Sequence, residues 1–60
     1  MTAEQLLEMA LADVDSKSTR AWATSAHNRP IWVQIAAKYL GKPDAAARLT
    51  TDIIITAIGL

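Results

Sequence analysis

The residues of this chain that could carry chemistry are few and widely spaced. His27 is the sole histidine and cysteine is absent, so the chain offers neither a thiol nucleophile nor a soft metal ligand. Asp13 and Asp15 are two residues apart, which would place them on different faces of a helix rather than in a carboxylate pair. Gly41 and Gly59 are the only glycines, too few for a phosphate-binding loop. The sequence therefore predicts a protein that is not an enzyme and uses no metal, cofactor or small-molecule substrate.

Charge is divided unevenly along the chain, although its formal net charge is zero. Residues 1–15 hold four acidic side chains and no basic one, which gives minus four. Residues 16–60 hold six basic and two acidic side chains, which gives plus four. We interpret this division as an acidic helix that packs beside basic ones, or that meets the basic part of a neighbouring chain. A nucleic-acid-binding face in the basic part is the alternative.

The length of 60 residues allows a single domain, residues 1–60, and the apolar fraction of 52% is too high for a disordered tail. A domain this small hides only about 60% of the surface that its unfolded chain exposes, so we expect association with a second copy or a protein partner to help stabilise it. No basic segment followed by an apolar stretch opens the chain, and the uncharged run 53–60 is far shorter than the about 20 residues of a membrane-spanning helix. The expected location is the cytoplasm.

The first helix is predicted over residues 3–14, where apolar residues recur at intervals of three and four. Thr2 and Gln5 have the spacing of a capping box, in which each side chain bonds to the backbone N–H of the other residue. The residues of the apolar face, which we expect in the core, are Ala3, Leu6, Leu7, Ala10, Leu11 and Val14.

A short second helix is predicted to end at Ala26 or His27, with either Ser16 or Ser18 as its N-cap. Trp22 is the only large apolar residue of this segment. Because its neighbours are small, we expect the indole ring to anchor the helix while staying partly exposed.

A third helix is predicted to begin at residues 28–30, because Asn28 tolerates a left-handed conformation and Pro30 suits the first helical position. Gly41 can take the positive φ that ends a helix. The apolar face that we expect in the core comprises Ile31, Trp32, Ile35, Ala36, Tyr39 and Leu40.

Residues 44–58 are predicted to form a fourth helix, whose repeating inner positions are Ala46, Leu49, Thr50, Ile53, Ala57 and Ile58. The β-branched segment 53–58 also fits a strand, but the chain has no second strand-like segment to pair with it. The sequence thus predicts an all-α fold, a small bundle of three or four short helices that is oligomeric.

Several apolar residues near the C-terminal end would remain on the surface of such a bundle. If residues 44–58 are helical, Ile55 lies opposite the core positions and Ile54 at their margin. The first helix could instead fold across these side chains and cover them. We favour a contiguous patch that binds a second copy or a protein partner, with the interface residues Trp22, Ile54, Ile55, Ile58 and Leu60.

Residues 31–52 resemble the helix-turn-helix unit of DNA-binding proteins. The resemblance rests on Ala37 and Gly41, which match the small residue and the turn glycine of that family, followed by Lys42-Pro43-Asp44 and a new helix. Lys42 stands where the family commonly has an apolar residue, and Ala47 and Thr50 are smaller than usual at their positions.

In that family the helix after the turn enters the major groove, and its early side chains touch base edges. The resemblance therefore implies a reading role for Asp44, Ala45, Arg48 and Thr51. Lys38, Lys42 and Arg29 would contact phosphates. Of these side chains only Arg48 could make a bidentate contact with guanine. DNA binding through Arg29, Lys38, Lys42, Arg48 and Thr51 is thus the alternative to a protein-binding module.

Overall fold

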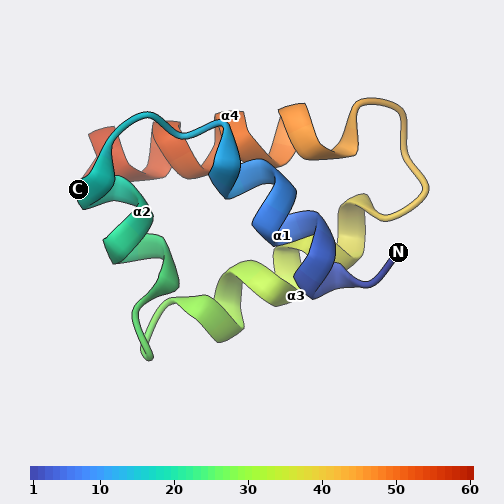
Figure 1. Ribbon diagram of the computed structural model, residues 1–60, viewed down its shortest axis with the longest axis horizontal. Helices are drawn as coiled ribbons and strands as arrows, with labels where there is room; N and C mark the ends of the chain where they lie inside the picture. The colour runs from blue at the N-terminus through green and yellow to red at the C-terminus, as the bar shows by residue number, and fades with distance from the viewer.

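Four α-helices and no strand make up the fold in the computed structural model, which describes residues 1–60 (Figure 1). They are α1 (Ala3–Ala12), α2 (Lys17–Thr24), α3 (Arg29–Tyr39) and α4 (Ala45–Ile58). The predicted all-α bundle is confirmed. Ile53 to Ile58 are helical, so the strand alternative for this segment is wrong. An isolated strand would have left its backbone groups unpaired, whereas a helix pairs them within the segment.

The starts of the first two helices follow the predicted capping chemistry. The Thr2 hydroxyl accepts from the Gln5 N–H at 3.1 Å, and the Gln5 side-chain oxygen accepts from the Thr2 N–H at 2.8 Å, so the capping box is confirmed. Ser16, and not Ser18, caps α2 by accepting from the Thr19 N–H at 3.2 Å. Both helices end two residues or more before their predicted ends, at Ala12 and Thr24.

The turn before α3 differs from the prediction in its backbone conformation. Asn28 is right-handed, with φ −94°, and its side-chain amide donates to the Trp22 carbonyl at 3.0 Å, so it ties the turn to the end of α2. α3 begins at Arg29, one residue before Pro30. The left-handed residues lie instead in the α3–α4 turn, at Gly41 (φ 80°), as predicted for that glycine, and at Asp44 (φ 55°).

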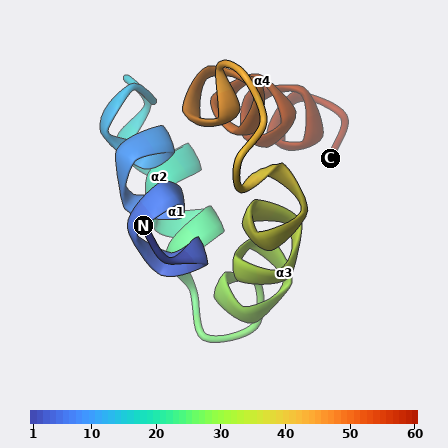
Figure 2. The ribbon, with the colours of Figure 1, turned by 90° about the vertical axis from the view of Figure 1, so that its right-hand side faces the viewer.

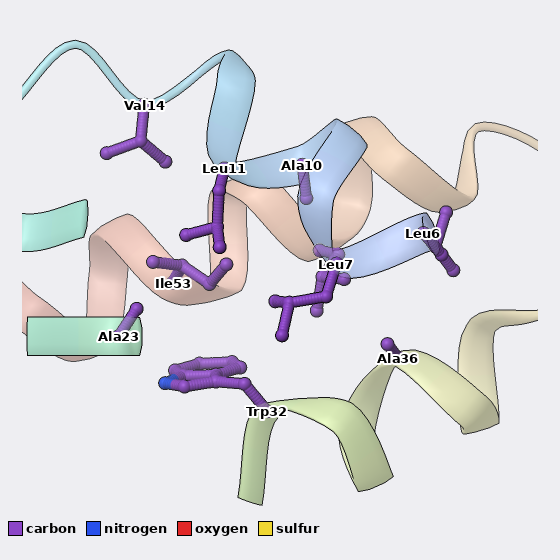
Figure 3. Packing of buried hydrophobic residues seen from close by; sticks show 10 residues of the cluster. Leu6, Leu7, Ala10, Leu11, Val14, Ala23, Trp32, Ala36 and Ile53 are labelled. Atoms are coloured by element: carbon purple, nitrogen blue, oxygen red, sulfur yellow. The ribbon is translucent and has the colours of Figure 1, made fainter. Parts of the chain in front are cut away.

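The core lies where α1, α3 and α4 meet, with α2 packed against α3 and α4 (Figure 2). Leu7 and Leu11 of α1 point toward Trp32 of α3 and Ile53 of α4 (Figure 3). A polar contact joins α1 to α4 as well, because the Thr50 hydroxyl donates to the Ala10 carbonyl at 2.8 Å. The ten apolar residues of the core are Leu6, Leu7, Ala10, Leu11, Val14, Ala23, Trp32, Ala36, Leu49 and Ile53.

The observed burial differs from the predicted core positions mainly at the ends of the helices. Ile31 and Leu40, at the two ends of the predicted α3 face, are exposed at 50% and 36%, because no element covers them. Ile58, at the end of α4, is exposed at 80% for the same reason. Along α1 every predicted core residue is buried except Ala3, which is half-buried.

The chain covers its own core. Its accessible surface is 3928 Å², and a folded monomer of 6.5 kDa has about 3,800 Å² by the usual scaling of surface with mass. No buried side-chain nitrogen or oxygen lacks a hydrogen-bond partner. The four helices of one chain therefore enclose the ten apolar core residues by themselves.

Two substitutions in α4 test which of its side chains face the core. Ile53→Ala removes a side chain that is 0% exposed, so we expect it to lower the free energy of unfolding by about 2–5 kcal/mol through reduced burial and a residual cavity. Ile55→Ala truncates a side chain that is 63% exposed, and we expect a change within about 0.5 kcal/mol. Urea unfolding of dilute protein measures both. Equal destabilisation by the two variants would contradict the placement of α4.

Candidate protein-binding surface on the fourth helix

α4 has two apolar sides, and the chain uses only one of them. Leu49, Thr50 and Ile53 are buried against α1 and α3. The opposite side, here called the outer face, consists of Ala47, Thr51, Ile54, Ile55 and Ile58, all of which are exposed.

Three isoleucines dominate the outer face. Ile54, Ile55 and Ile58 are exposed at 37%, 63% and 80%. Ile58 lies four residues after Ile54 and three after Ile55, so the side chains are neighbours on the helix surface. α1 does not cover them, because it packs on the side of α4 that carries Thr50. The alternative in which the first helix encloses these residues is thus wrong.

Thr51 carries the only hydroxyl of the outer face, and this hydroxyl already donates to the Ala47 carbonyl at 3.0 Å. The exposed Arg48, the last basic residue of the chain, borders this face seven residues before Ile55. Removing water from this face would therefore strand no hydroxyl donor, which keeps the cost of covering it low.

Asp52, the one acidic residue in this part of α4, points elsewhere. Its carboxylate accepts a hydrogen bond from the Tyr39 hydroxyl of α3. This hydrogen bond, reinforced by burial and by the negative charge of Asp52, raises the pKa of Tyr39. The contact joins the C-terminal end of α3 to the middle of α4, so the acid lies on the α3 side of α4 and leaves the outer face uncharged.

Trp22 and Leu60, the other two predicted interface residues, lie together at a different place. Trp22 is half-buried and packs edge-to-face on Trp32, with ring centroids 6.0 Å apart and an interplanar angle of 75°. With Ala57 and Leu60 it lines a hollow of about 210 Å³ between α2 and the end of α4. Leu60 itself is 79% exposed. The structure thus divides the predicted patch into the outer face and this hollow.

Two methionines form an apolar surface that sequence reasoning missed. Met1 and Met9 are exposed at 72% and 48%. Both line a groove of about 500 Å³ between α1 and the start of α4, together with Leu6, Asp13 and residues of the segment 41–47. Met9 on the polar side of α1 was the available signal in the sequence, but the groove itself depends on the meeting of distant segments.

The basic residues of the DNA-binding alternative are spread over three elements. Arg29 forms the structure's one salt bridge, to Glu4 of α1 at 3.1 Å, with side chains that are 41% and 63% exposed. Lys38, Lys42, Arg48 and Thr51 are exposed on α3, the turn and α4. Ala37, the small residue of the helix-turn-helix resemblance, is exposed, whereas its neighbour Ala36 is fully buried.

Comparison with known proteins gives no relative for this chain. No protein family, no curated protein and no solved structure matches it. The structure contains no group of three or more His, Cys, Asp or Glu side chains placed to hold a metal ion. None of the four helices has the length and apolar character needed to cross a bilayer.

The Tyr39–Asp52 contact can be tested by titration, since Tyr39 is the only tyrosine and its ultraviolet absorbance reports its ionisation directly. We expect Asp52→Asn to lower the pKa of Tyr39 toward its usual value, because the negative acceptor is removed. A raised pKa favours the neutral phenol in the folded state. Its stabilisation is therefore complete below the usual tyrosine pKa and is lost as pH rises through the raised pKa.

The control for this titration is Asp44→Asn, which changes an exposed carboxylate outside the contact and should leave the absorbance midpoint unchanged. An unaltered Tyr39 midpoint in Asp52→Asn would contradict the hydrogen bond and its role in placing Asp52 on the α3 side.

Proposed function

We propose that this chain is a non-enzymatic helical interaction module that binds protein through the outer face of α4. The single observation that carries the proposal is the exposure of Ile54, Ile55 and Ile58 on one side of a helix whose other side fills the core. Scattered surface isoleucines are ordinary, but neighbouring ones that form an uncharged strip are typical of binding surfaces.

The fold gives no structural reason for three large aliphatic residues at these positions. The core is closed without them, and its buried α4 residues are Leu49, Thr50 and Ile53. Polar residues at 54, 55 and 58 would be equally compatible with a helix and would reduce the exposed apolar surface. A requirement outside the fold explains the isoleucines, and binding of an apolar protein surface is such a requirement.

Site-specific photo-crosslinking in cells tests this function without knowledge of the partner. A benzophenone amino acid in place of Ile58 should form covalent adducts with protein, because position 58 is 80% exposed at the proposed contact. The matched control places the same group at Ile31, an equally aliphatic residue that is 50% exposed on α3. Equal or absent adduct formation at the two positions would refute the proposed surface.

Duplex DNA binding is the second candidate, favoured by the exposure of Lys42, Arg48 and Thr51 after the left-handed turn at Gly41. We rank it lower for two reasons. Ala45, Ala46 and Ala47 at the start of α4 offer no hydrogen bonds to base edges. The net charge is zero, so acidic α1 would offset part of the attraction to phosphates.

The DNA candidate makes its own prediction. If it holds, the double variant Lys42→Ala with Arg48→Ala should bind duplex DNA more weakly, and the slope of log affinity against log salt should become shallower by about 1 for each phosphate that is no longer neutralised. Lys17→Ala, an exposed base on α2, is the control and should change neither quantity. Fluorescence anisotropy at several salt concentrations measures both. Absence of binding by the parent chain would eliminate this candidate.

A further inference from the structure

We propose that the outer face of α4 binds the outer face of α4 in a second copy of this chain, with the two helices antiparallel about a two-fold axis. This inference rests on the function proposed above and names its partner. Three observations carry it, namely the spacing of the outer-face residues, the sizes of the side chains that would meet, and the charges at the two ends of α4.

The spacing of the outer-face residues is self-complementary. Ala47, Thr51, Ile54 and Ile58 follow one another at intervals of four, three and four residues, the spacing of a seam between paired helices. This order of intervals reads the same in both directions along the chain. An antiparallel second copy can therefore lie with Ala47 level with the partner's Ile58, and Thr51 level with the partner's Ile54, as a two-fold interface requires.

The sizes of the side chains also match in this arrangement. Ala47 is the smallest residue of the seam and would meet Ile58, which projects furthest from the surface with 80% of its area exposed. A small residue opposite a large one lets helices interdigitate at the usual separation of about 8–10 Å. In the parallel arrangement Ile58 would meet the partner's Ile58, and Ala47 would leave a gap opposite the partner's Ala47.

Charge favours the antiparallel orientation as well. α4 has the acidic Asp44 at its N-cap but no basic residue in its last turn, so the negative end of its dipole has no complementing side chain of its own. Antiparallel pairing brings Arg48 level with the partner's Ala57, beside the last carbonyls of that helix.

The methionine-lined groove of a second copy would fit the outer face less well than a second outer face does. Its lining includes Asp13, Lys42 and Asp44, whereas the outer face offers these charged groups no counterpart. A contact between two different surfaces also leaves each copy with one free surface of each kind, so it would extend without limit unless it closed into a ring. The α4 pair closes at two copies.

The expected dimer is small and reversible. α4 has 14 residues and is therefore about 21 Å long. A standard interface buries about 800 Å² on each partner. That area is close to one fifth of this chain's accessible surface of 3928 Å². One face of a single helix of this length buries less than that, so the pairing should be weak. Dimer formation should therefore depend on protein concentration.

Disulfide cross-linking between two variants tests the pairing and its direction, because the chain has no cysteine of its own. Ala47→Cys and Ile58→Cys change exposed residues and should leave the fold intact. Antiparallel pairing puts position 47 level with the partner's position 58, whereas two copies of position 58 are offset by about 16 Å along the helix. A disulfide needs Cα atoms within about 7 Å.

The expected result is that an equal mixture of the two variants forms a disulfide-linked dimer of mixed composition under mild oxidation, several-fold more than either variant alone. Ala21→Cys, on the exposed side of α2, is the control and should not exceed background with either variant. Cross-linking of Ile58→Cys with itself above the mixture would overturn the antiparallel pairing. Absence of any cross-link above the control would overturn self-association.

The proposed binding surface and the proposed pairing of two copies can be contradicted independently. Photo-adducts of position 58 with a different protein, together with no cross-link between copies, would leave α4 as a binding surface while removing the second copy as its partner. Absence of adducts at position 58 would contradict the proposal that the outer face binds protein.

Discussion

The structure depends on the angle at which α4 is rotated about its own axis. Neighbouring residues on a helix are about 100° apart, so a rotation of one residue would exchange Ile53 for Ile54 in the core. Apolar burial favours the observed orientation, because the same rotation would also replace the fully buried Leu49 by Thr50. Two polar contacts favour this orientation as well. The Thr50 hydroxyl reaches the Ala10 carbonyl on one side, and Asp52 accepts from the Tyr39 hydroxyl on the other.

This rotation decides what the molecule exposes. With Thr50 held toward α1 and Asp52 toward α3, the remaining side of α4 can only face solvent or another molecule. That side is uncharged beyond Arg48, and its one hydroxyl, of Thr51, already bonds to the backbone of the same helix. The same two contacts that orient the helix thus also leave an apolar strip that costs little to desolvate. Fold and proposed function are linked through this one helix.

Much of the fold could be predicted from local sequence patterns. The α1 core face and the Thr2–Gln5 capping box depend on residues a few positions apart, so periodicity and side-chain chemistry were sufficient. The ends of α3 were predicted less well, because Ile31 and Leu40 fit the helical repeat but no other element reaches them. The methionine groove and the separation of Trp22 from the isoleucines depend on how distant segments meet, which local patterns do not contain. For α4 the helical repeat predicted the buried positions Leu49, Thr50 and Ile53 correctly, but it also placed Ile58 inside, where no other element reaches it.

Sedimentation equilibrium over a wide range of protein concentration distinguishes a chain that pairs through α4 from one that stays single. We expect the average mass of the parent chain to rise from one chain of 6.5 kDa toward two as concentration increases. Ile58→Lys should remain at one chain mass throughout, and Ile31→Lys should behave like the parent. A parent chain that stays at one chain mass at every concentration, or an Ile58→Lys variant that associates as the parent does, would contradict this pairing.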